Sequence, residues 1–106
     1  MVSVIEEKRA ELARLCARYG VRRLDIFGSA ATGERFDAQT SDLDFLVEFQ
    51  RTDAMNVADQ YFGLREDLRA LFGRDVDLVM TRAMRNPYFI EAVNRTRRPL
   101  YAAGVA

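Results

Sequence analysis

Residues 28–49 read GSAATGERFDAQTSDLDFLVEF and place a glycine turn, a polar loop and two aspartates directly before an apolar run. The run LDFLVEF is typical of a central strand that is covered on both faces. Asp42 and Asp44 nevertheless stand at its start, and an unpaired charge in apolar surroundings is unfavourable by several kcal/mol. The fold must therefore compensate these two carboxylates.

Hydrophobic periodicity around this stretch predicts strands that alternate with amphipathic helices. The predicted strands are residues 22–27, 43–49 and 75–80, and the predicted helices are residues 4–18 and 57–72. A further helix of about ten residues is predicted after Asn86-Pro87, because proline suits the first helical turn. SAATG is predicted as a brief helical turn, and a short apolar segment ends the tail. Asp25 is expected to face solvent between two apolar neighbours.

Length and composition predict one small globular domain over residues 1–106, with 49% hydrophobic and 30% charged residues. The 16 basic residues balance the 16 acidic ones, so there is no net field that would attract nucleic acid or anionic lipid.

Cys16 is the only cysteine, which excludes an internal disulfide. No apolar run approaches the roughly 20 residues of a membrane span, and no export signal is evident. A cytoplasmic protein without a membrane anchor is expected.

Three carboxylates are the candidate reactive groups. Asp42 and Asp44 alternate along one strand and therefore project to the same side, and a neighbouring strand could bring Asp77 beside them. Three such charges repel each other unless a cation lies among them. Mg²⁺ takes oxygen ligands and completes its shell with substrate phosphates, as in phosphoryl and nucleotidyl transfer. The pattern favours a metal-dependent site of that class.

Gly28 and Ser29 supply a candidate phosphate site. A glycine turn between a strand and a helical turn exposes backbone N–H groups to an anion, and the serine hydroxyl adds a donor. Two other residues are less certain members of the site. Asp75 could compete with Asp77 for the role of third carboxylate, and Arg82 could reach a triphosphate, although a solvated surface arginine is the favoured interpretation.

The order of these motifs carries a family resemblance. FGSAATGE, a polar loop, SDLDFLVEF and later VDLV resemble the nucleotidyltransferase superfamily. The sequence is specifically similar to the minimal nucleotidyltransferases encoded beside HEPN-domain proteins, the MntA-like antitoxins. The likeness runs from about Val21 to Met80, and RNPYFIEAVNR followed by PLYAA is similar to the C-terminal segment of that family. Twelve residues separate Ser29 from Asp42, a longer loop than many small members have.

The resemblance implies an α/β (α+β) nucleotidyltransferase fold, with a mixed sheet of about four strands flanked by helices. It implies that Asp42, Asp44 and Asp77 are catalytic residues and metal ligands, with two Mg²⁺ ions, and that Gly28 and Ser29 bind the ATP substrate. It further implies a protein adenylyltransferase that acts as an antitoxin. Its partner would be a HEPN toxin in a hetero-oligomer, and a tyrosine of that toxin would receive AMP.

Two alternatives remain open at this point. The chain could be a non-catalytic antitoxin that covers its toxin, with Tyr88, Phe89 and Val93 expected as exposed apolar residues of the binding surface. It could also be a nucleotidyltransferase that acts on a nucleic acid or a small-molecule acceptor. The zero net charge and the absence of a long basic segment argue against a nucleic-acid partner.

Overall fold

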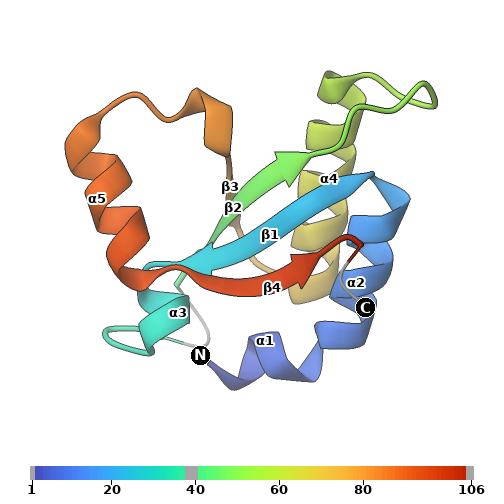
Figure 1. The fold of residues 1–106 in the computed structure, drawn as a ribbon. Helices are drawn as coiled ribbons and strands as arrows, with labels where there is room; N and C mark the ends of the chain where they lie inside the picture. Colours follow the sequence, from blue (N-terminus) through green and yellow to red (C-terminus); the bar gives the residue numbers. More distant parts are fainter. Residues whose placement is uncertain (1, 38–40, 105–106) are drawn as a thin grey trace.

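The computed structural model describes residues 2–37 and 41–104 as a four-stranded sheet flanked by helices (Figure 1). Residues 1 and 105–106 of the predicted domain and residues 38–40 of the predicted polar loop lie outside the described residues. In chain order the elements are α1 (Ser3–Glu7), α2 (Arg9–Arg18), β1 (Val21–Phe27), α3 (Ser29–Thr32), β2 (Leu43–Phe49), α4 (Val57–Phe72), β3 (Val76–Met80), η1 (Thr81–Ala83), α5 (Pro87–Thr96) and β4 (Arg98–Ala102).

The sheet has the strand order β3-β2-β1-β4. Strand β1 runs antiparallel to both β2 and β4, whereas β2 and β3 run parallel because helix α4 returns the chain between them. The expected mixed sheet of about four strands with flanking helices is confirmed. The short apolar segment of the tail forms β4, which pairs with β1 at one edge of the sheet.

One face of the sheet packs on α2 and α4 and forms the main hydrophobic core, which we call the apolar face. Alternate residues of β1 and β2 point into it, and helical residues at three- and four-residue spacing cover them. The Phe45 ring packs on Phe72 with centroids 6.0 Å apart. The fully buried members include Leu12, Cys16, Leu24, Ile26, Phe45, Val47, Leu64 and Leu68.

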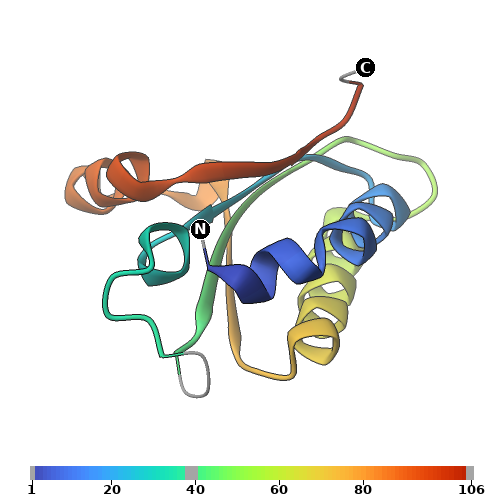
Figure 2. The same ribbon diagram turned by 90° about the horizontal axis from the view of Figure 1, so that it is seen from below.

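The opposite side of the sheet is covered by α5, and we call it the α5 face (Figure 2). A smaller cluster of Phe27, Leu46 and Val93 fills it, and the Phe27 and Phe89 rings meet edge to face at 6.1 Å. The expectation that Val93 is exposed was wrong, because Val93 is 1% exposed and lies on the inner side of α5. Tyr88 is 83% exposed and Phe89 is 37% exposed, as expected.

The first predicted helix, residues 4–18, is divided into α1 and α2 at Lys8. The Val2 N–H donates to the carbonyl of Ala30, which fixes the start of α1 beside α3. Because the chain bends at Lys8, Ile5 and Leu12 still reach one core. Periodicity showed the buried positions but not the bend.

The later helices begin and end near their predicted residues. Asn56 caps α4 by accepting the N–H of Asp59, and Gly73 ends this helix in the left-handed conformation. Asn86 caps α5 by accepting the N–H groups of Tyr88 and Phe89. Within residues 2–37 and 41–104, no helix is long and apolar enough to cross a lipid bilayer.

Candidate active site

Three strands bring the candidate carboxylates to one end of the sheet. Asp44 of β2 lies opposite Phe27 at the end of antiparallel β1, and opposite Asp77 near the start of parallel β3. Side chains on a strand alternate, and the neighbours Leu46 and Val79 both belong to the α5 face. Asp44 and Asp77 therefore lie side by side on the α5 face. The predicted proximity of these two residues follows directly from the register.

Asp44 has an unusual electrostatic environment. Partial burial has the largest effect on the pKa of the Asp44 carboxyl, and the nearby negative charges of Asp77 and Asp42 add to it. Together they raise this pKa to about 6. Both charges act on Asp44 in the same direction as its burial. The site thus concentrates negative charge in partly desolvated surroundings, and a bound cation would relieve this repulsion.

Gly28 allows the turn after β1 to approach Asp44 closely. Its φ of +72° lies in the region that favours glycine, and a Cβ added there would lie 2.7 Å from Asp44 Oδ2. The carboxylate of Asp44 therefore occupies the space that a side chain at position 28 would fill. Ser29 follows at the first residue of α3, where helical N–H groups have no intrahelical partner.

The two remaining candidates differ from Asp44 in exposure. Asp42, just before β2, and Asp77 are both exposed, so the apolar neighbours of Asp77 in the sequence do not bury it. Asp75 is exposed as well, and its carboxylate lies 3.5 Å from Arg69 of α4. An ion pair thus accounts for Asp75, whereas Asp77 has Asp44 as its neighbour across the sheet.

The donor set suits a hard divalent cation. Carboxylate oxygens are the ligands that Mg²⁺ prefers, and this ion binds through one or two carboxylates together with waters and substrate phosphates. In residues 2–37 and 41–104, no group of three or more His, Cys, Asp and Glu side chains is arranged to hold a metal ion. The neighbouring carboxylates of Asp44 and Asp77 fit an ion that takes its other ligands from water and substrate phosphates.

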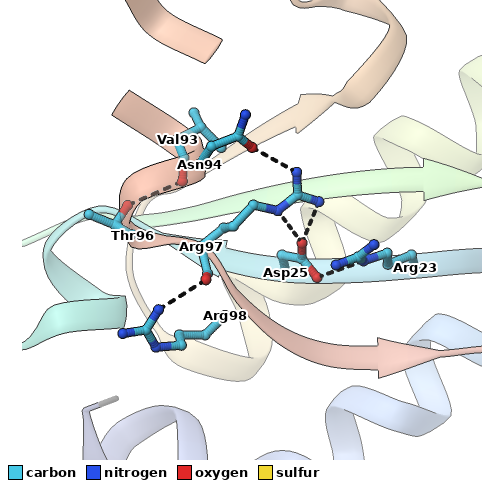
Figure 3. Close-up of polar contacts among 7 residues, drawn as sticks. All are labelled: Arg23, Asp25, Val93, Asn94, Thr96, Arg97 and Arg98. Atoms are coloured by element: carbon cyan, nitrogen blue, oxygen red, sulfur yellow. Dashed lines mark hydrogen bonds and ion pairs between the residues drawn. The ribbon is translucent and has the colours of Figure 1, made fainter. Parts of the chain in front are cut away.

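Asp25 corrects a prediction. It was expected to face solvent but is 1% exposed, because the side chains of Arg97, directly after α5, and Arg23 lie against it. Arg97 approaches its Oδ2 with Nε at 2.7 Å and Nη2 at 2.6 Å, and Arg23 Nε donates to Oδ1 at 3.2 Å (Figure 3). Two arginines thus compensate this buried carboxylate.

Thr96, at the end of α5, also reaches the site. Its Oγ1 accepts the backbone N–H of Gly28 at 2.9 Å, across 68 residues of sequence. No local motif in the sequence indicates this contact. The composition RRLDIF around Asp25 was a usable signal for the ion pair, since a carboxylate among apolar strand residues needs a partner.

A more enclosed concave region lies elsewhere. A cleft of about 550 Å³ is formed at the other end of β2 and β3, and Arg51, Asn56 and Arg82 are among its lining residues. Arg82 follows the end of β3, so it lies at the opposite end of that strand from Asp77. The carboxylates themselves sit at an open end of the sheet, and Asp42 borders a shallow hollow there.

Comparison with known proteins identifies the family. The sequence matches the nucleotidyltransferase domain family over residues 9–100. It is 34% identical over 84 residues to the protein adenylyltransferase MntA of Thermococcus cleftensis, covering 79% of this chain and 77% of that protein.

Solved structures agree with this match. A minimal nucleotidyltransferase superposes with a TM-score of 0.71 and 34% identity, covering 92% of this chain and 93% of the other. A chain of a mutant MntA–HepT toxin–antitoxin complex superposes with a TM-score of 0.62 and 25% identity, covering 93% and 73%. With its carboxylates and glycine turn at one end of the same mixed sheet, this chain belongs to the nucleotidyltransferase family.

Proposed function

We propose that this chain is a protein adenylyltransferase and antitoxin, which transfers AMP from ATP to a tyrosine hydroxyl of a partner HEPN toxin and so neutralises it. The pairing of Asp44 with Asp77 beside the Gly28 turn carries the proposal. The similarity to MntA and to a chain of an MntA–HepT complex supports the acceptor class. We also propose that residues 1–106 form a single minimal nucleotidyltransferase domain that works in the cytoplasm.

We assign metal binding to Asp42, Asp44 and Asp77, with two Mg²⁺ ions in the loaded enzyme. When bound, these ions neutralise phosphate charge and the charge that develops at the α-phosphorus. The carboxylates contribute oxygen ligands, and the partial burial of Asp44 strengthens its attraction for a cation. The raised pKa of Asp44 implies that metal competes with a proton for this oxygen below about pH 6.

The proposed reaction is a displacement at the α-phosphorus. The tyrosine oxygen forms a bond to this phosphorus, the bond to the oxygen that bridges the α and β phosphates breaks, and pyrophosphate leaves with that electron pair. We assign Asp77 the additional role of accepting the hydroxyl proton. The Ser29 hydroxyl and the backbone N–H groups of the Gly28–Ser29 turn would bind phosphate oxygens and orient the nucleotide.

Transfer of label from ATP to the toxin tests this proposal. Wild-type protein, incubated with Mg²⁺ and a HEPN-domain toxin, should transfer label from α-labelled ATP and none from γ-labelled ATP. The double variant Asp42→Asn with Asp44→Asn should lose this transfer. Asp75→Asn is the matched control, because Asp75 is an exposed carboxylate next to β3 that pairs with Arg69. Equal transfer by the double variant and by the wild type would refute the site assignment.

A non-catalytic antitoxin is the second candidate, and exposed aromatic residues favour it. Tyr88 on α5 and Phe62 on α4 are 83% and 59% exposed, and exposed aromatic side chains are frequent in protein interfaces. Growth of cells that carry the toxin distinguishes the two functions. If the Asp42→Asn, Asp44→Asn variant rescues growth while the mass of the toxin stays unmodified, the protein neutralises its toxin by binding to it and not by transferring AMP.

A further inference from the structure

The corner between α5 and β4, residues 94–98, makes one contact with β1, through Asp25 (Figure 3), and one with Gly28, directly after β1. Thr96 makes the first contact. Its hydroxyl oxygen accepts the Gly28 N–H at 2.9 Å and lies 3.5 Å from the carbonyls of Ala92 and Val93, to which it can donate. One hydroxyl thus joins the last turn of α5 to the residue that begins the glycine turn.

The Gly28 N–H depends on this side chain. Backbone N–H groups at the end of a strand need a partner when they leave the ladder, and at Gly28 this partner comes from 68 residues later in the sequence. Gly28 also has the positive φ that brings its Cα against Asp44. A contact that holds the Gly28 peptide therefore also holds the distance between the turn and the Asp44 carboxylate.

Arg97 makes the second contact. Its guanidinium approaches Asp25 Oδ2 with two nitrogens, and its Nη1 donates to Asn94 Oδ1 at 3.0 Å. Asp25 is buried in β1, three residues before Gly28. Arginine presents its donors in a rigid planar fork, so this contact fixes the orientation of the corner as well as its distance from β1.

We propose that Thr96 and Arg97 are positioning residues, which clamp the corner onto β1 and hold the Gly28–Ser29 turn in the geometry that binds the nucleotide phosphates. This proposal rests on the proposed function for its effect on catalysis. Thr96 acts on the turn directly through the Gly28 N–H, whereas Arg97 acts on it through Asp25, three residues earlier in the chain. With this clamp, the geometry of the Gly28–Ser29 turn depends on the C-terminal end of α5.

Thr96→Val tests the clamp, because valine has nearly the same shape but cannot accept a hydrogen bond. We expect the KM for ATP to rise about tenfold, with a smaller change in kcat, since one hydrogen bond to the turn is lost. Thr96→Ser keeps the hydroxyl and should restore both constants to within about twofold of wild type. If the serine variant is as impaired as the valine variant, the hydroxyl is not the cause and the proposal fails.

A second readout does not depend on enzymatic transfer. Exchange of the Gly28 amide hydrogen, followed by NMR in the absence of nucleotide, should accelerate about tenfold in Thr96→Val and stay unchanged in Thr96→Ser. Thr81→Val is the matched control, because Thr81 lies at the opposite end of the sheet. Unchanged Gly28 exchange in Thr96→Val would overturn the clamp, even if the wild type transfers AMP.

Arg97→Lys provides a further variant if Thr96→Val does not fold. Lysine keeps the charge beside Asp25 but loses the two-nitrogen fork, so we expect the same rise in the KM for ATP and faster Gly28 exchange, each by severalfold. Wild-type values in both measurements would overturn the role of Arg97. Wild-type protein that transfers no label would refute the proposed function, whereas the exchange measurement would still decide the clamp.

Discussion

The two faces of the sheet differ in how they are held together, although they are formed by alternate residues of the same strands. On the apolar face, Leu24, Ile26 and Phe45 are fully buried against helices, and packing alone stabilises them. On the α5 face, the intervening residues Asp25 and Asp44 are carboxylates, and specific polar contacts or a cation must compensate them. One face therefore supports the fold, and the other is available for chemistry.

Truncation on the apolar face should have the largest effect on stability. Phe45→Ala removes a fully buried ring that packs on Phe72 and should lower the free energy of unfolding by about 3–5 kcal/mol. Urea denaturation measures this loss. Phe62→Ala is the control, because Phe62 is 59% exposed and its truncation should change stability by about 0.5 kcal/mol or less. Similar losses in the two variants would contradict the described core.

Breaking the ion pair between Arg97 and Asp25 on the α5 face should have the second-largest effect on stability. Arg97→Met leaves buried Asp25 with Arg23 as its remaining partner and should lower the free energy of unfolding by about 3 kcal/mol. Arg95→Met is the matched control two residues away, since Arg95 forms an exposed pair with Glu91 that contributes about 0.5 kcal/mol. Indistinguishable denaturation midpoints for these two variants would argue that the face is not held by its ion pair.

Ligand binding at the carboxylates of the α5 face should stabilise the folded protein. Mg²⁺ with ATP at about 100 times its Kd should stabilise the folded protein by about 2.7 kcal/mol, which raises the Tm by several degrees for a domain of this size. EDTA should reverse the shift, and Asp44→Asn should lose most of it. Thermal unfolding of wild type, Asp44→Asn and Asp75→Asn measures the effect. A Tm of the wild type that does not respond to Mg²⁺ and ATP would contradict the proposed site.

The smallest expected effect concerns the pH dependence of the apo protein. The pKa of Asp44 is raised from 3.8 to about 6 by burial and by the charges of Asp77 and Asp42. The folded state therefore binds this proton more tightly than the unfolded state, and the associated stability is present below about pH 4 and lost as the pH rises through about 6.

Asp44→Asn removes this dependence. The variant should gain stability over wild type by on the order of 1 kcal/mol at pH 7, a value reduced for the partial solvent exposure of Asp44, and should gain little at pH 4. Urea denaturation at both pH values, without divalent ions, gives the difference. A wild type that is as stable as the variant at both pH values would show that the three charges do not repel each other in the folded state.

The apolar face and the positions of Asp44 and Asp77 were predicted well from the sequence, because both depend on local periodicity. Strand alternation placed Asp44, and the parallel strand after α4 brought Asp77 into register with it. The α5 face was predicted less well. Whether Val93 and Asp25 are exposed depends on where α5 and Arg97, directly after it, pack against the sheet, and periodicity within a single element does not contain that information.

The contacts of Thr96 and Arg97 could not have been predicted from spacing, since each joins residues about 70 positions apart. Asp25 could have been recognised by the argument that applies to Asp44. Both are carboxylates between apolar strand residues, and such a position requires a partner or a ligand. The argument identifies the need for compensation but does not identify the residue that supplies it.

The position of β4 beside β1 also determines when the protein can become active during its synthesis. A chain emerges from the ribosome with its N-terminal end first, at about 5–20 residues per second, and contacts between residues far apart in the sequence form late. Helices α2 and α4 can pack on β1 and β2 before Thr96 and Arg97 emerge. Until then, Gly28 and Asp25 lack their partners from the α5–β4 corner. A nascent chain should therefore form its hydrophobic core first and fix the geometry of its Gly28–Ser29 turn last.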